Sequence, residues 1–340
     1  MAKILVIRFS ALGDVAMAVP VLYSFAKAYP QHQLVVLSRK AMAPLFSFAP
    51  ANLQFKGIDL KNDCKGVKGL MRIYSELHKE KFDAVADLHD VLRTKILRLR
   101  FRMNGVRVRH INKGRKEKRN LIFQKAKTPL KTSFRRYQEV FEALGYPFPV
   151  RFNSIFESCN PPSPPQTLAG RKKGNKWIGI APFAAHKGKI YPLPLQHEVV
   201  RQLSAMDNVH IFLFGGGNKE KEISDTWEKE FSHVTSVVGR LQMEEELALM
   251  SKLDVMLAMD SSNMHLASLT GTPVVSIWGA THPYAGFMGW GQDEANIIQL
   301  DLPCRPCSIY GNKPCRWKDY RCLTNIRPET IVGRIRSLIR

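Results

Sequence analysis

Long hydrophobic runs are missing from this 340-residue chain, although 45% of its residues are hydrophobic. No apolar segment approaches the roughly 20 residues that a membrane-spanning helix needs. The first apolar run begins at Ile4 and is closed by Arg8 after four residues, so it is too short for a secretory signal and predicts a strand. We therefore expect a globular protein that stays in the cytoplasm.

Acidic residues are also scarce, at 29 against 51 lysines and arginines, which gives a net charge of +22. Such a balance favours anionic partners. The excess is concentrated in one basic segment, residues 93–119, where Glu117 is the single acid among twelve cations. Nucleic acid, phosphorylated lipid and an anionic membrane all fit this segment. Because RNA-binding surfaces usually add several stacking aromatic residues and this segment has only Phe101, nucleic acid is not expected as a partner.

Cysteine is uncommon, and four of the six cysteines are crowded near the end of the chain, at Cys304, Cys307, Cys315 and Cys322. Without a secretory signal, a disulfide framework is not expected. The first gap of two residues is that of a zinc knuckle, whereas the next gaps of seven and six are irregular for one. Reduced cysteines that pack a loop are favoured, and no metal ligands are assigned.

Several catalytic motifs are absent. The chain has no Asp-x-Asp pair of the kind that holds Mg²⁺ or Mn²⁺ against a sugar diphosphate. It also has no zinc-protease, kinase or nucleophile-elbow motif. A bound diphosphate would therefore have its charge met by lysine and by helix N-termini, and no cofactor is expected.

Strand and helix patterns alternate along the chain, which is typical of parallel α/β sheets with crossover helices. A stretch with four prolines in five positions interrupts this alternation inside residues 159–176, which predicts a linker. We therefore expect two Rossmann-like domains, 1–158 and 177–326, that face one another across a ligand cleft. Residues 327–340 predict a terminal helix, expected to pack back on the first domain.

The predicted strand Lys3–Arg8 ends in the small-residue turn Ser10-Ala11-Leu12-Gly13-Asp14, which leads into a helix. Open α/β sheets bind ligands beyond the carboxyl ends of their strands. Gly13 permits close approach of a ligand to the backbone. Asp14 places a carboxylate there, either as a catalytic base or as a helix cap.

In the second half, Asp260 to His265 directly follows a predicted strand and opens a helix. Free N–H groups and the positive end of the helix dipole would make this an anion site, although Asp260 or Ser261 could equally cap the helix. A second polar loop, 279–283, follows the next strand along the chain. Two such loops at one edge of a sheet favour a diphosphate site.

Two further loops offer charged side chains. Lys187 and Lys189 follow the strand at 177–181, and either can reach a phosphate or remain solvated. Glu220 and Glu222 follow a glycine turn that matches neither the Walker loop nor the dinucleotide fingerprint. A carboxylate at this position could hold ribose hydroxyls or face water.

In this order, these motifs resemble those of glycosyltransferase family 9, whose best-known members are ADP-heptose:lipopolysaccharide heptosyltransferases. Ser10–Asp14 resembles the turn whose aspartate is the proposed general base. Lys189–Pro192 is similar to the segment whose lysine meets the donor phosphate, and Asp260–His265 to the donor-diphosphate segment. The resemblance covers nearly the whole chain and implies a GT-B fold, with the acceptor bound by the first domain and the nucleotide sugar by the second.

The resemblance implies an inverting, metal-independent transfer of heptose from ADP-heptose to a phosphorylated, Kdo-bearing lipid A acceptor. The basic segment would hold this acceptor and lie against the anionic inner face of the cytoplasmic membrane. Transfer of a hexose or N-acetylhexosamine to a surface glycan is the alternative, and a basic nucleic-acid-binding protein and a sugar-nucleotide epimerase of the same two-domain fold are less favoured. The implied site comprises Asp14 as base, Ser10, Gly13 and Arg93 for the acceptor, and Lys189, Glu220, Asp260, Ser261, Ser262, Asn263, Met264 and His265 for the donor.

Overall fold

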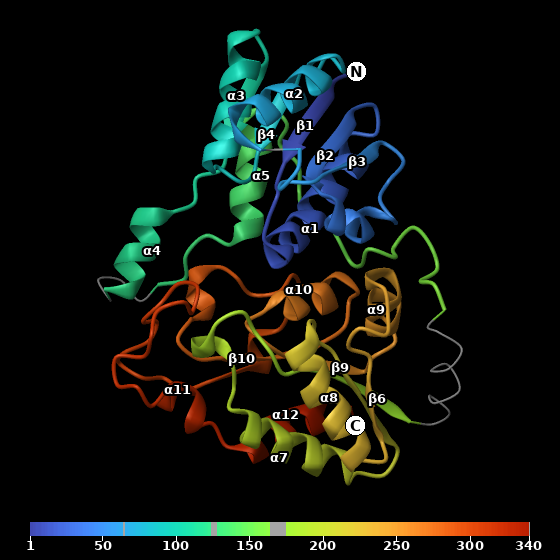
Figure 1. The fold of residues 1–340 in the computed structure, drawn as a ribbon, viewed down its shortest axis with the longest axis vertical. Coiled ribbons are helices and arrows are strands. Elements are labelled where there is room, and N and C mark those ends of the chain that lie inside the picture. The colour runs from blue at the N-terminus through green and yellow to red at the C-terminus, as the bar shows by residue number, and fades with distance from the viewer. Residues whose placement is uncertain (64, 124–127, 164–174, 340) are drawn as a thin grey trace. The chain divides into compact units, whose positions relative to one another are not determined.

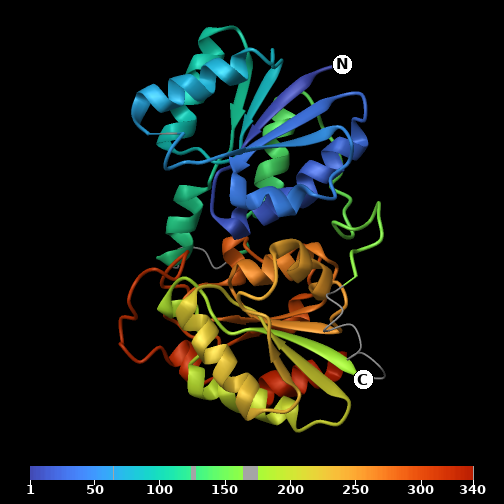
Figure 2. The same cartoon turned by 45° about the vertical axis from the view of Figure 1, so that its right-hand side comes forward.

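The computed structural model describes residues 1–63, 65–123, 128–163 and 175–339. The chain divides into two compact units, one comprising residues 1–114 and 131–159 and the other residues 115–130 and 160–340. Each unit is built on one parallel sheet with helices on both faces (Figures 1 and 2). No helix in the described ranges combines the length and the apolar character needed to cross a membrane.

The first unit has five parallel strands in the order β3-β2-β1-β4-β5. The strand β1 is buried from Ile4 to Ile7, as expected for the centre of a parallel sheet. Helices α2 and α3 pack on one face, while α1 and α5 pack against each other (Figure 1). The elements are β1 (Lys3–Ile7), α1 (Leu12–Ala28), β2 (Gln33–Arg39), η1 (Lys40–Phe46), β3 (Leu53–Ile58), α2 (Gly66–His78), β4 (Ala84–Asp87), α3 (Leu92–Met103), β5 (Arg107–His110) and α5 (Ser133–Ala143).

The second unit has six parallel strands in the order β11-β10-β9-β6-β7-β8. Its central strands β6, β9 and β10 are mostly apolar and are buried except at Lys176, the first residue of β6. The elements are α4 (Arg115–Ile122), β6 (Lys176–Ala181), η3 (Lys187–Lys189), α7 (Leu193–Ser204), β7 (Val209–Leu213), α8 (Asn218–Glu230), β8 (Val234–Ser236), α9 (Met243–Met250), β9 (Val255–Met259), α10 (Ser262–Leu269), β10 (Val274–Trp278), η4 (Pro283–Ala285), η5 (Glu294–Asn296), β11 (Ile297–Gln299), α11 (Arg321–Thr324) and α12 (Pro328–Leu338).

The terminal helix α12 differs from expectation in its position. It packs on α7, β9 and β10 of the second unit, where Ile331, Val332 and Ile335 join the hydrophobic core. The expected return to the first domain is therefore wrong, because this apolar face completes the core beside α7. Of the expected linker at 159–176, residues 164–174 lie outside the described residues.

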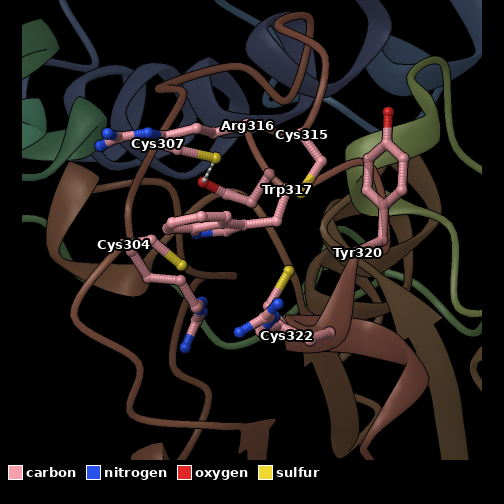
Figure 3. A pocket seen from close by; sticks show the side chains of 10 residues that line it. Cys304, Cys307, Cys315, Arg316, Trp317, Tyr320 and Cys322 are labelled. Carbon is pink, nitrogen blue, oxygen red and sulfur yellow. Dashed lines mark hydrogen bonds between the residues drawn. The ribbon is translucent and has the colours of Figure 1, made fainter.

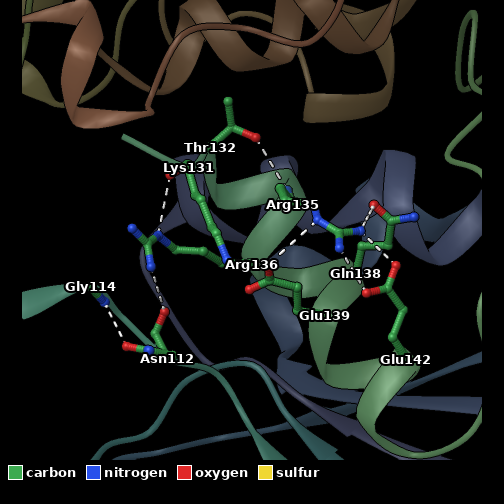
Figure 4. Close-up of polar contacts among 9 residues, drawn as sticks. All are labelled: Asn112, Gly114, Lys131, Thr132, Arg135, Arg136, Gln138, Glu139 and Glu142. Carbon is green, nitrogen blue, oxygen red and sulfur yellow. Dashed lines mark hydrogen bonds and ion pairs between the residues drawn. The ribbon is translucent and has the colours of Figure 1, made fainter. Parts of the chain in front are cut away.

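A buried arginine of α5 holds the turn at which the chain leaves the first unit. The Arg136 guanidinium donates to the carbonyl oxygens of Lys131 and Asn112, both at 3.2 Å (Figure 4). Gly114 adopts a positive φ of 60° beside this guanidinium, and a Cβ there would collide with it. The next segment, containing α4, belongs to the second unit. The sequence did not indicate this excursion.

Candidate functional site

Each sheet reverses its strand order at one place, between β1 and β4 in the first unit and between β6 and β9 in the second. Ligands of open α/β sheets bind beyond the carboxyl ends of the strands at such a point. The loops after β1 and β4 lead to Asp14 and His89, and those after β6 and β9 carry Lys189 and Asp260. Asp14, Lys189 and Asp260, which were selected from the sequence, therefore lie at the switch points.

Asp14 combines a capping role with a partly exposed carboxylate. It lies in the first turn of α1, where its Oδ2 accepts from the Ala11 N–H at 3.0 Å. The same oxygen lies 2.7 Å from Nη2 of Arg8, whose side chain is 7% exposed, whereas that of Asp14 is 35% exposed. Because one oxygen makes both contacts, the other remains available to a ligand.

Besides its ion pair with Asp14, Arg8 contacts a backbone carbonyl oxygen and an aromatic ring. Its Nη1 donates to the carbonyl oxygen of Leu88 at 2.7 Å, which ties the end of β1 to the loop after β4. Its guanidinium lies over the Tyr137 ring, 5.8 Å from the centroid, and the Tyr137 hydroxyl donates to the Asp14 carbonyl oxygen at 3.2 Å. This buried cation holds the Asp14 carboxylate in one orientation.

His89 is a neighbour that no sequence motif identified. Its Nδ1 accepts from the Phe9 N–H at 3.4 Å, and its Nε2 lies 3.5 Å from the Ser10 hydroxyl. Burial, together with the charges of Arg8 and Lys113, lowers the pKa of His89 to about 3. The imidazole is therefore neutral at physiological pH, and its Nε2–H faces Ser10.

The neutral state of His89 predicts acid sensitivity. The unfolded chain takes up a proton at His89 below its ordinary pKa of 6.5, while the folded chain does so only near 3, so falling pH favours unfolding across this window. We expect this residue to account for about 2 kcal/mol of the stability lost between pH 7 and pH 5. Urea unfolding should therefore show a weaker pH dependence for His89→Gln than for the wild type. An equal dependence would contradict the buried neutral state.

The three expected acceptor residues are placed differently. Ser10 is half-buried beside His89, and Gly13 lies next to Asp14 in the first turn of α1. Arg93 is exposed near the start of α3, and its charge contributes to the lowered pKa of His89. Ser10 and Gly13 thus flank the Asp14 carboxylate on the loop, while Arg93 comes from the other element at the switch point.

In the second unit, the start of α10 lacks a side-chain cap. Ser261 occupies the N-cap position, yet its side chain accepts no hydrogen bond from the first turn, and its Oγ has no partner among the described residues. The Asp260 carboxylate, which is 5% exposed, instead pairs with Nζ of Lys189 at 3.0 Å. The capping interpretation of these residues is therefore wrong. The first-turn N–H groups remain available to an anion.

Lys189 and Lys187 differ in the residues that they contact. The alkyl chain of Lys189 packs on Gly311, where a φ of 75° and the closeness of the lysine leave no room for a Cβ. The Lys187 ammonium instead lies over the Tyr320 ring, 5.2 Å from its centroid. Only Lys189 is directed to the start of α10.

The remaining expected donor residues fall into two groups. Ser262 and Asn263 are half-buried in the first turn of α10. Met264 and His265 are buried, so the structure places their side chains beneath the surface of the site. The carboxylate of Glu220 accepts from the Gly216 N–H at 2.7 Å, and burial raises its pKa despite this bond.

Arg305 organises the loop after β10 and was not identified from the sequence. It is buried and donates to the carbonyl oxygens of Gly279 and Thr281 at 2.5 and 2.9 Å. The Ala280 N–H in turn donates to the Gly188 carbonyl oxygen at 2.8 Å, which joins this loop to the one that carries Lys189. The second polar loop expected at this edge is thus part of the same framework.

The four late cysteines line a cavity of about 20 Å³ together with Trp317 (Figure 3). All four are free thiols. Burial raises the pKa of Cys322 to about 11 and also raises that of Cys307, so these two thiols are protonated at neutral pH. In the part of the chain that the structure covers, no three histidine, cysteine or acidic side chains are grouped to hold a metal ion.

Comparison of the sequence finds relatives along nearly the whole chain. The sequence model of glycosyltransferase family 9 (heptosyltransferase) matches residues 70–318. Lipooligosaccharide heptosyltransferase 2 of Campylobacter jejuni subsp. jejuni is 23% identical, over 97% of this chain and 96% of that protein.

Solved structures share the fold of this chain. The family 9 glycosyl transferase of Veillonella parvula has a TM-score of 0.74 at 17% identity and covers 99% of this chain and 97% of its own. The E. coli heptosyltransferase WaaC with ADP-2-deoxy-2-fluoro heptose has a TM-score of 0.70 at 16% identity, with 98% and 99% covered. The expected GT-B type of fold, with two Rossmann-like units, is confirmed.

Proposed function

Because this chain belongs to glycosyltransferase family 9, we propose that it transfers a heptose from ADP-heptose to the inner core of lipopolysaccharide. Support comes from the C. jejuni relative, which is named for heptose transfer and matches the chain nearly end to end. The structural observation that carries the proposal is the uncapped start of α10, with Lys189 directed to it. A free helix N-terminus beside a lysine supports the assignment of a diphosphate site here.

The donor is assigned to the second unit. The first-turn N–H groups of α10 and the Lys189 ammonium would meet the diphosphate charge without a metal ion, in keeping with the absence of an Asp-x-Asp pair. Glu220, held at the glycine turn after β7, would accept hydrogen bonds from the ribose hydroxyls. Asp260 orients Lys189 and remains buried beneath it.

The base is assigned to the first unit. The Asp14 carboxylate would take the proton of an acceptor hydroxyl as its oxygen attacks the anomeric carbon of the heptose. The bond from that carbon to the diphosphate oxygen breaks with the electron pair on the leaving ADP, so the configuration inverts. ADP leaves as an anion whose charge must be stabilised, and no second acid is required.

The acceptor is assigned as a phosphorylated, Kdo-bearing lipid presented at the cytoplasmic face of a membrane. The exposed Arg93 guanidinium beside the Asp14 loop would bind an acceptor phosphate. The net charge of +22 favours such an anionic surface.

Nucleotide preference tests the donor assignment. A nucleotide present at a hundred times its Kd for the native state stabilises that state by about 2.7 kcal/mol, which raises the melting temperature by about 4 °C in a chain of this size. We expect this shift with ADP and smaller shifts with UDP and GDP. Heptosylated acceptor should then form from ADP-heptose, as detected by mass spectrometry. A preference for UDP or GDP would favour transfer of a different sugar.

A further inference from the structure

The outward face of α3 exposes three large hydrophobic side chains. Leu92, Leu99 and Met103 are 74%, 56% and 67% exposed. Spacings of seven and four residues place them on one side of the helix, and we call these three residues the α3 stripe. The opposite side faces the core and holds Thr94, Leu97 and Phe101, all buried. The α3 stripe therefore lies outside the hydrophobic core of this unit.

Exposed cations flank the α3 stripe on both sides. At about 100° per residue, Arg93 and Arg100 project to one side of it and Lys95 and Arg102 to the other. Lys95 approaches Asp90 at 4.0 Å, whereas the three arginines form no ion pair within the described chain. Arg98 differs, since it turns inward to pair with Asp87 and Asp90 at 3.0 Å.

We propose that α3 lies flat on an anionic lipid surface, with the α3 stripe at the acyl boundary and the flanking cations among the lipid phosphates. An apolar face between basic residues is the pattern of interfacial helices, in which long cationic side chains reach up to the headgroups. At 12 residues, α3 is far too short to cross a bilayer. The inference deepens the proposed function and rests on it for the lipid nature of the acceptor.

Charge complementarity favours lipid over a second copy of the chain. Residues 91–103 contain no acidic side chain, and the whole chain carries a net charge of +22. Two such faces brought together would oppose like charges, whereas anionic headgroups neutralise them.

The position of α3 connects the proposed lipid contact to the Asp14 loop. The helix begins directly after the loop that follows β4, where the Leu88 carbonyl oxygen holds Arg8 and His89 contacts Ser10. A docked α3 would therefore bring the Asp14 loop to the level at which a lipid-borne acceptor presents its sugar.

Vesicle binding tests the proposal with the full chain. In flotation with vesicles of phosphatidylglycerol and phosphatidylethanolamine, we expect the variant L92S/L99S/M103S to bind at least ~10-fold more weakly than the wild type. The variant K95Q/R100Q/R102Q should bind these vesicles at least ~10-fold more weakly than the wild type. Its binding should also depend less on the salt concentration. Neither variant should change the weak binding expected on pure phosphatidylcholine.

Matched controls separate a local effect from a general one. The variant F123S/Y310S/W317S removes hydrophobic side chains that are 61%, 52% and 53% exposed in the second unit, and K229Q/K313Q/R327Q removes exposed cations there. Both should bind vesicles as the wild type does. If they lose as much as the α3 variants, the contact is not specific to α3 and the proposal fails. It also fails if the α3 variants bind normally, or if L92S/L99S/M103S dissociates a dimer in sedimentation, which would identify a second copy as the occupant.

Transfer to a soluble acceptor distinguishes failure of the docking proposal from failure of the proposed function. L92S/L99S/M103S should transfer heptose normally to a deacylated acceptor and poorly to the same acceptor in vesicles. An equal loss on both would overturn the docking role. If even the wild type transfers no heptose to either acceptor, the proposed function fails, and vesicle flotation still decides whether α3 binds lipid.

Discussion

Replacing Asp14 by asparagine is expected to slow heptose transfer at least ~100-fold, because the acceptor hydroxyl would lose its base. The amide oxygen can still accept from the Ala11 N–H, so the start of α1 should remain formed. ADP should still raise the melting temperature of this variant, since the proposed donor residues belong to the other unit. Transfer assays at saturating ADP-heptose measure the effect on kcat directly.

Glu245→Gln is the matched control for Asp14→Asn. The Glu245 carboxylate also occupies the first turn of a helix, α9, and accepts from the Gln242 N–H at 2.7 Å. Loss of charge at a capping position alone lowers the free energy of unfolding by about 1 kcal/mol or less. The activity of Glu245→Gln should therefore stay within about twofold of the wild type. If Asp14→Asn behaves in the same way, Asp14 is a cap and the proposed base is wrong.

Replacing Lys189 by methionine is expected to lower kcat/KM for ADP-heptose by ~100- to 1000-fold, the scale seen when one group that stabilises developing charge is removed. ADP should also bind more weakly, because the diphosphate is already charged before transfer. The measurements are initial rates over a range of ADP-heptose and thermal shifts over a range of ADP.

Two further variants show whether an activity loss in Lys189→Met comes from lower stability and whether it is specific to this lysine. Lys189→Met alone leaves the buried Asp260 carboxylate unpaired, which costs about 3 to 5 kcal/mol. The double variant K189M/D260N should therefore recover stability but not activity. Lys187→Met, whose lysine lies over Tyr320, should retain activity. Equal losses for Lys187 and Lys189 would show that neither lysine has a specific role at the diphosphate.

The alternation of strands and helices could be predicted because the central strands are continuous apolar runs and most helices carry one apolar face. The segment 115–122 gave no such signal, since Leu121 is its single buried residue among mostly charged neighbours. The face of α12 that includes Ile331 and Ile335 showed that this helix must be buried. It could not show against which unit, because any apolar surface satisfies the same pattern.

The candidate site was predictable at the level of loops and less so at the level of side chains. Polar residues directly after apolar strands identified the switch points. The sequence could not separate Lys189 from Lys187, because the choice depends on Gly311 and Tyr320, which are more than a hundred residues away. His89 gave no signal at all, since its neutral state results from burial beside cations that only the fold brings near.

Because residues 115–130 belong to the second unit, the gene cannot be divided cleanly at the proline-rich segment. Within the second unit, the Lys118 ammonium lies over the rings of Phe287 and Tyr310, 4.4 and 5.8 Å from their centroids, and Leu121 is 1% exposed. A fragment ending in the proline-rich segment would carry α4 without these rings, and the complementary fragment would lack α4. Cutting the coding sequence there would therefore leave two incomplete products, each with an uncovered surface prone to aggregation.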